Sequence, residues 1–173
     1  MKTTLLCLTL LAAVPGSAAT ILFQDDFSTD TDGTPVAGLT NWNILNGTNV
    51  DVGDFGALCS PGASKCIDTQ GSGGNPNADI QTKNSFALSP GFTYTFSFTM
   101  NSGANSSFLV TIGTAFSQLF PAGTADGAKS FQFTAGVQNA AIRITDQGPT
   151  DNVGVYIGNI LTHLGPRHGT RCP

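Results

Sequence analysis

The sequence has 173 residues, of which only 10% are charged, with 7 basic residues against 11 acidic ones and a formal net charge of −4. This sparse and acidic balance excludes the basic surface that nucleic acids and anionic membranes require, so neither is an expected partner. Every acidic residue is Asp, and Thr, Ser, Gly, Asn and Phe are abundant, which disfavours helices and indicates an all-β composition.

Residues 1–19 have the pattern of a secretory signal peptide. Lys2 gives a positive start, Leu5 to Val14 form an apolar run, and Ser17 to Ala19 form a small-residue cleavage site. The apolar run is about half as long as a membrane-spanning helix, and no later segment is apolar enough to cross a membrane. We therefore expect a signal-peptide helix followed by an exported chain that has no membrane span.

Residues 20–161 are predicted to form one domain of short strands. Polar and apolar residues alternate with a period of two, and no window has helical periodicity. Gly, Pro, Asn or Asp, the residues that turns require, bound each run. The expected strands cover 20–27, 41–46, 48–53, 65–69, 78–88, 92–101, 107–113, 115–120, 129–135, 139–146 and 152–161. So many short strands in one chain predict a two-sheet antiparallel β-sandwich of jelly-roll type.

Several aspartates lie at the end of the first expected strand or just after it. They are Asp25, Asp26, Asp30 and Asp32, and the D-x-D-G spacing resembles part of a calcium loop. Ca²⁺ prefers carboxylate and carbonyl oxygens gathered from loops, so a structural calcium site is one hypothesis for this segment. The alternative is a solvated acidic turn that uses Asp for its turn propensity.

The sole tryptophan, Trp42, marks the best candidate cluster for a glycan site. Its polar companions in this hypothesis are Asn41, Asn43, Asp68 and Gln70. Ligand sites commonly combine an aromatic ring with a few polar groups that fix orientation. The alternative is a tryptophan that anchors the core between the two sheets.

Cys59 and Cys66 bracket the short loop CSPGASKC, which has Pro61 and Gly62 at its turn. In an oxidising compartment the simplest interpretation is a local disulfide. A metal site would need further Cys or His nearby in the sequence, and there is none. Cys172 is left over.

The segment SPGFTYTFSFTMN contains a row of large apolar residues that alternate with Thr and Ser: Phe92, Tyr94, Phe96, Phe98 and Met100. In a strand these five share one face. Exposed to water, they would form a larger apolar patch than soluble proteins usually tolerate, so we expect the row in the core rather than on a ligand platform. The intervening Thr and Ser are expected to face water.

Taken in order, the segments LFQDDF, NWNILNGTNVDV, SPGFTYTFSF and DNVGVYIGNI resemble a recurrent domain of exported bacterial proteins. These are single-domain jelly-roll proteins, many with a PEP-CTERM sorting signal, similar in shape to galactose-binding-like domains and carbohydrate-binding modules. The resemblance covers nearly all of 21–161. It implies a cell-surface or extracellular location. It also implies a structural Ca²⁺ where the first strand meets the last, which adds Asp151 to the candidate ligands. Residues 162–173 lack the sorting signal and are expected to form an irregular tail.

Catalysis is not expected. A Ser-His-Asp site needs a rigidly held histidine, and both histidines, His163 and His168, lie in the expected tail. Glycoside hydrolysis needs two opposed carboxylates, and without Glu only pairs of Asp remain, most of which lie in turns. The favoured function is a secreted, non-catalytic module that binds extracellular or cell-surface polysaccharide. The alternatives are a structural or assembly protein of the cell surface or biofilm matrix and, more weakly, a hydrolase.

Overall fold

The computed structural model describes residues 19–36, 38–46, 50–59, 65–72, 77–102, 106–149 and 154–165. The signal-peptide prediction lies outside these residues except for Ala19. Within the described ranges, no helix combines the length and the hydropathy that a membrane crossing needs.

Two antiparallel sheets contain most of the strands. The larger, seven-stranded sheet has the order β11-β8-β14-β5-β4-β2, and β1 pairs with β14. Its strands are β11 (Gly127–Thr134), β8 (Thr93–Asn101), β14 (Tyr156–Leu164), β5 (Cys66–Asp68), β4 (Val50–Gly53), β2 (Gly33–Val36) and β1 (Thr20–Asp25).

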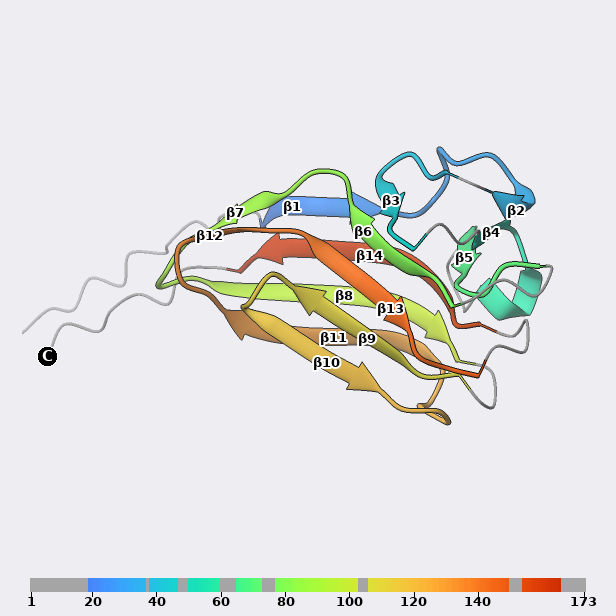
Figure 1. Ribbon diagram of the computed structural model, residues 1–173. Coiled ribbons are helices and arrows are strands. Elements are labelled where there is room, and N and C mark those ends of the chain that lie inside the picture. The colour runs from blue at the N-terminus through green and yellow to red at the C-terminus, as the bar shows by residue number, and fades with distance from the viewer. Residues whose placement is uncertain are drawn as a thin grey trace, which may run out of the picture.

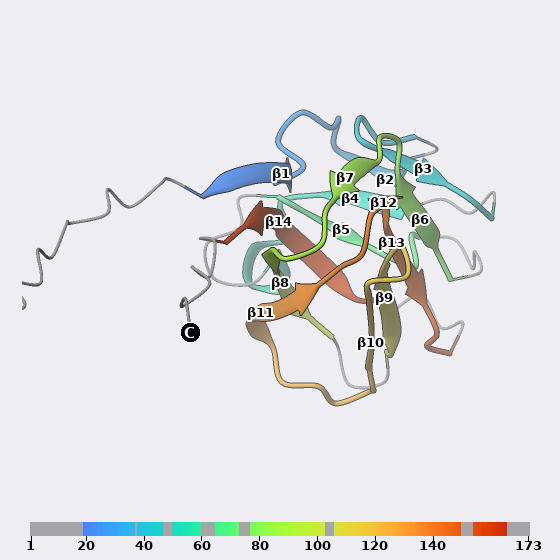
Figure 2. The ribbon, with the colours of Figure 1, turned by 90° about the vertical axis from the view of Figure 1, so that its left-hand side faces the viewer.

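The smaller, five-stranded sheet has the order β10-β9-β13-β6-β3. Its strands are β10 (Phe116–Phe120), β9 (Phe108–Ile112), β13 (Ile142–Asp146), β6 (Asp79–Thr82) and β3 (Trp42–Ile44). A separate two-stranded ladder joins β7 (Phe86–Leu88) to β12 (Gln138–Ala140), and a short 3₁₀ helix, η1, covers Gly56–Cys59. Figures 1 and 2 show the two large sheets as stacked layers. The predicted all-β antiparallel sandwich is confirmed.

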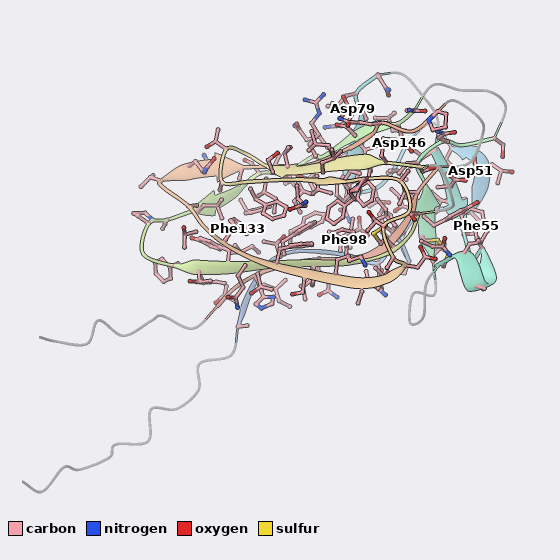
Figure 3. All side chains as sticks on the ribbon, turned by 90° about the horizontal axis from the view of Figure 1, so that it is seen from below. Asp51, Phe55, Asp79, Phe98, Phe133 and Asp146 are labelled. Atoms are coloured by element: carbon pink, nitrogen blue, oxygen red, sulfur yellow. A yellow bond between two sulfur atoms is a disulfide. The ribbon has the colours of Figure 1, made fainter. Side chains whose placement is uncertain are left out.

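The aromatic row of β8 lies in the core, as predicted. Tyr94, Phe96, Phe98 and Met100 are at most 2% exposed, and Phe92, directly before the strand, is half-buried against them. Figure 3 shows Phe98 between the two layers. On the opposite face of β8 the prediction of solvent exposure is wrong for Thr99. It is buried and donates its hydroxyl to the carbonyl of Gly158 at 3.0 Å, because β14 and η1 both lie against this part of β8.

One side of the sandwich ends in two edge strands, β10 in one sheet and β11 in the other, each paired on one side only. Both strands lie along the lower side in Figure 1. Phenylalanines from the two strands fill the space between them: the ring centroids of Phe120 and Phe131 are 5.5 Å apart, and those of Phe116 and Phe133 are 5.6 Å apart. This aromatic packing closes the core on the side where neither sheet continues.

The predicted disulfide is confirmed: Cys59 at the end of η1 is bonded to Cys66 at the start of β5, with 5.4 Å between their Cα atoms. Both cysteines are buried. The backbone N–H of Phe55 also donates to Sγ of Cys59 at 3.3 Å. The disulfide therefore holds η1 and the segment before it against the outer face of the seven-stranded sheet.

The observed strands differ from the prediction in four main respects. The expected strand 78–88 is broken into β6 and β7, and 139–146 into β12 and β13, because each pair of pieces belongs to different sheets. β2 was not predicted. The last strand continues to Leu164 rather than ending at 161, so part of the expected irregular tail is in a sheet, and His163 pairs with Thr95 and Ile21.

Candidate functional site

Trp42 is a core residue. Only 1% of its surface is exposed, and its indole N–H donates to Oδ2 of Asp25 at 2.8 Å. Phe23 contacts it edge-on, with the ring centroids 5.5 Å apart, and Phe27 stacks on it at 6.3 Å. The ring is not available to a ligand. Trp42 therefore anchors the core between the two sheets, which was the alternative interpretation of this residue.

Three of the other predicted ligand residues are engaged in holding the fold. Asn41 donates its amide to Oδ2 of Asp25 at 3.2 Å. Asp68 and Gln70 are buried, and Oδ1 of Asp68 accepts the backbone N–H of Gln70 at 3.0 Å. The side-chain amide of Gln70 donates to Oδ1 of Asn77 at 2.9 Å. These side chains connect loops rather than forming a common site with Trp42.

Asp68 belongs to a polar cluster on the outer face of the seven-stranded sheet. It lies opposite Asp51 of β4 on one side and Tyr156 of β14 on the other. Both oxygens of Asp51 accept hydrogen bonds from Ser72, at 2.6 to 3.0 Å. Burial raises the pKa of Asp68, and burial together with the nearby Asp68 charge raises the pKa of Tyr156 to about 12. Phe55 packs edge-on against Tyr156 at 5.4 Å. Figure 3 places Asp51 and Phe55 at the same end of the molecule. Because the side chains of this cluster bond to one another and to Ser72, the cluster is suited to stabilising the loops at this end of the molecule.

Asn43 is the one predicted ligand residue that lies on an open surface. Because side chains alternate along a strand, Trp42 points into the core and exposed Asn43 points outward from the five-stranded sheet. The register continues this position across every strand of the sheet, since Asn43 lies opposite Gln81, Gln81 opposite Arg143, Arg143 opposite Thr111, and Thr111 opposite Ser117. We call this outer surface the polar face and these five side chains its polar row.

A second row on the polar face runs beside the first. Asp79 lies opposite Thr145, Thr145 opposite Leu109, and Leu109 opposite Leu119, which is 47% exposed. The second row is therefore polar at one end and apolar at the other. Figure 3 shows Asp79 on the outer side of its sheet, away from Phe98 and Phe133.

Arg143 and Asp79 form an ion pair at the centre of the polar face. Nε of Arg143 donates to Oδ1 of Asp79 at 2.7 Å, and Nη2 donates to Oδ2. Thr145 donates its hydroxyl to the same Oδ1 at 3.2 Å. The hydrogen bond with Asp79 raises the pKa of Arg143, so the guanidinium stays charged and is held in one orientation.

The predicted calcium ligands are dispersed. Both oxygens of Asp25 accept N–H donors, Asp26 accepts the backbone N–H of Ser28, and Asp32 pairs with Lys65 at 2.8 Å. Oδ1 of Asp30 accepts the backbone N–H of Thr40, while Oδ2 is buried with no hydrogen-bond partner among the described residues.

The described part of the chain contains no group of three or more Asp, Glu, His or Cys side chains that could hold a metal ion. Asp151 lies outside the described residues. The residues that are described therefore do not fit a shared calcium site.

No protein-family model matches the sequence, and no curated protein matches it. Solved structures resemble the fold. The K1 cleaved adhesin domain of Lys-gingipain from Porphyromonas gingivalis W83 matches with a TM-score of 0.54 and 10% identity, over 81% of this chain and 96% of that chain. The K2 cleaved adhesin domain of Lys-gingipain matches with a TM-score of 0.52 and 14% identity, over 85% of this chain and 98% of that chain.

A third similar structure contains the CBM22-1 and GH10 modules of endo-1,4-β-D-xylanase 10B from Clostridium thermocellum, complexed with xylohexaose. It matches with a TM-score of 0.52 and 13% identity, over 90% of this chain and 30% of that chain. The present chain therefore spans less than a third of the xylanase chain. At these identities the three likenesses establish a common β-sandwich fold.

Proposed function

We propose that this domain binds polysaccharide through the polar face. The observation that supports this best is the polar row, which crosses all five strands of the sheet with a hydrogen-bonding side chain on each. Adjacent strands lie about 4.8 Å apart, so the row extends over about 19 Å. A row of that length can contact several consecutive sugar units of an extended chain.

The chemistry of the polar face suits sugars. Sugar hydroxyls both donate and accept hydrogen bonds. Asn43 and Gln81 offer amides that do both, Thr111 and Ser117 offer hydroxyls, and Arg143 offers donors. Leu109 and Leu119 give an apolar contact for the C–H groups of a sugar ring. All these groups stand on a rigid sheet, so little side-chain and backbone ordering is needed on binding.

The likeness to the CBM22-containing xylanase structure also supports polysaccharide binding, because a carbohydrate-binding module of this fold occurs there in a chain complexed with xylohexaose. Binding without cleavage is part of the proposal. Among the described side chains of the polar face, Asp79 is the one carboxylate, and it already pairs with Arg143, whereas glycoside hydrolysis uses two opposed carboxylates. An extracellular or cell-surface location is also proposed, supported by the disulfide and by the signal pattern of residues 1–19.

The test compares two double variants by affinity electrophoresis in gels that contain soluble xylan, mixed-linkage glucan or another neutral polysaccharide. Asn43→Ala with Gln81→Ala removes two amides from the polar row. Ser130→Ala with Gln132→Ala removes two exposed polar groups from β11, on the outer face of the other sheet, and is the matched control.

Loss of two neutral hydrogen bonds is expected to weaken binding roughly thirtyfold in the first variant, while the control binds like the wild type. If a polysaccharide retards both variants as strongly as the wild type, the ligand binds outside the polar face. If no polysaccharide retards the wild type, the proposed function is wrong.

A further inference from the structure

We propose that the polar face selects neutral glycan chains and discriminates against uronic-acid polymers, because Asp79 neutralises Arg143 and fixes its orientation at the centre of the face. This inference rests on the proposed function, and it names the class of polysaccharide that the same face accepts. Asp79 is a positioning residue here, and Arg143 is the specificity-determining one.

The charge distribution of the polar face is the first argument. Within the described strands of this sheet, the outward-facing side chains carry two charges, those of Arg143 and Asp79, and these belong to one ion pair. Lys83 follows β6 at the rim, and its ammonium donates to the carbonyl of Leu39 at 2.7 Å. The whole chain has a formal net charge of −4, which further disfavours a polyanion.

The geometry of the ion pair is the second argument. Asp79 occupies Nε and Nη2 of Arg143, so Nη1 points away from the carboxylate in the guanidinium plane. The side chain of Arg143 is 47% exposed and that of Asp79 is 14% exposed. A ligand therefore meets a fixed, flat set of donors whose charge Asp79 already neutralises. Hydroxyl oxygens suit these donors, whereas a ligand carboxylate finds no net positive charge to pair with.

A bidentate arginine–carboxylate pair is a strong, directional interaction, so a carboxylate on a flexible polymer cannot easily replace Asp79. Removal of the Asp79 charge should instead leave Arg143 as an exposed cation in the middle of the polar row. The pair thus predicts a gain of function from a single substitution.

The experiment measures affinity for a neutral polysaccharide retained by the wild type and for polygalacturonate, at low and high salt. The variant is Asp79→Asn, which keeps an acceptor for Thr145 and removes the charge. The matched control is Asp32→Asn, which changes the net charge equally and frees Lys65 from the ion pair at 2.8 Å, away from the polar face. Melting curves check that both variants are folded.

We expect the wild type and Asp32→Asn to bind the neutral polymer and to bind polygalacturonate only weakly. Asp79→Asn should gain about tenfold in affinity for polygalacturonate at low salt, and salt should abolish the gain. Should Asp79→Asn fail to fold, Arg143→Ala is the second variant. It should bind the neutral polysaccharide more weakly than the wild type does and should gain no affinity for polygalacturonate.

Preferential, salt-sensitive binding of polygalacturonate by the wild type would overturn this inference and leave the proposed function standing. A folded Asp79→Asn with no gain, or an equal gain in Asp32→Asn, would also overturn it. Binding of neither class of polymer by the wild type would overturn both proposals.

Discussion

The indole N–H of Trp42 and the backbone N–H of Phe27 donate to different oxygens of one carboxylate, that of Asp25, each at 2.8 Å. Asp25 thereby connects β3 to the end of β1 and supports the turn at Phe27, whose φ of 59° lies in the left-handed region. This carboxylate is buried, so its function is to satisfy donors that would otherwise be without partners.

We expect Asp25→Ala to lower the free energy of unfolding by about 3 kcal/mol, because buried N–H groups lose a charged acceptor. Urea denaturation measures the change. Asp26→Ala, at the neighbouring and more exposed position, should cost less than about 1 kcal/mol. Similar losses in both variants would contradict the structural role of Asp25.

Gly154 is predicted to be intolerant of any side chain. A Cβ atom there would lie 2.3 Å from Oδ1 of Asp68 and 2.4 Å from the backbone nitrogen of Gln70. Since a backbone atom cannot rotate away, Gly154→Ala should destabilise the domain by about 2 kcal/mol. Gly136→Ala, where a Cβ meets nothing within 4 Å, is the control for thermal melting. A Gly154→Ala protein that melts with the control would show that the loop at this end can shift.

The raised pKa of Asp68 predicts a pH dependence of stability. Burial is the main cause, the nearby Asp51 charge adds to it, and hydrogen bonds from Gln70 and Tyr156 oppose it. Between the ordinary and the raised pKa the folded state binds more protons than the unfolded state. The contribution of Asp68 to stability therefore falls as pH rises above about 4.

Asp68→Asn removes this titration, so its stability relative to the wild type should increase as pH rises from about 4 to 7. Urea denaturation at several pH values gives the difference. A difference that is constant with pH, or one that decreases, would mean that Asp68 is not held in a site that disfavours its charge.

Calcium remains a proposal, and among the described residues it now depends on Asp30. Among the four candidate aspartates, the Oδ2 of this residue is the one oxygen that is both buried and without a partner in the described ranges. If Ca²⁺ binds there, a hundredfold excess over Kd should stabilise the fold by about 2.7 kcal/mol and EDTA should reverse the effect. Asp30→Asn should remove the response, and identical melting of the wild type in Ca²⁺ and EDTA would exclude the site.

Lys129 is predicted to keep the edge strand β11 from pairing with other chains. It lies opposite Phe98, on the inner side of an edge strand, and its ammonium donates to the carbonyl of Ala125 at 2.5 Å. A charged, inward-directed residue is one way in which natural edge strands avoid association. Lys129→Val should therefore associate at concentrations where the wild type and Lys83→Val are monomeric in sedimentation. Association of the wild type itself would favour the assembly alternative.

The parts of the fold that local pattern determines were predictable from the sequence. The strict alternation in TYTFSFTM places its aromatics inside because no other arrangement hides them, and the short spacing of Cys59 and Cys66 predicts their bond. The final boundary was not predictable, because β14 continues past Leu161 by pairing with both β1 and β8. His163 lies opposite Ile21 and Thr95, which are 142 and 68 residues away in the sequence, so these pairings leave no local signal.

The residues of the predicted ligand cluster do not share one surface, for a reason that was present in the sequence. Asn41, Trp42 and Asn43 are consecutive, so a strand must send the middle residue to the opposite face from its neighbours. The polar row could not be assembled in advance. Its residues come from β3, β6, β9, β10 and β13, and neighbouring strands in this sheet are mostly distant in sequence, so the row depends on pairings that only tertiary structure fixes.

The antiparallel pairing of β1 with β14 has a mechanical consequence. Thr20 lies directly opposite Leu164, so the first and last strands leave the sandwich from the same place. Tension between the two ends would load the hydrogen bonds of this ladder one at a time, as in opening a zipper, rather than all together. β1 should then peel away at low force and lengthen the tether, while the five-stranded sheet that carries the polar face bears none of the load.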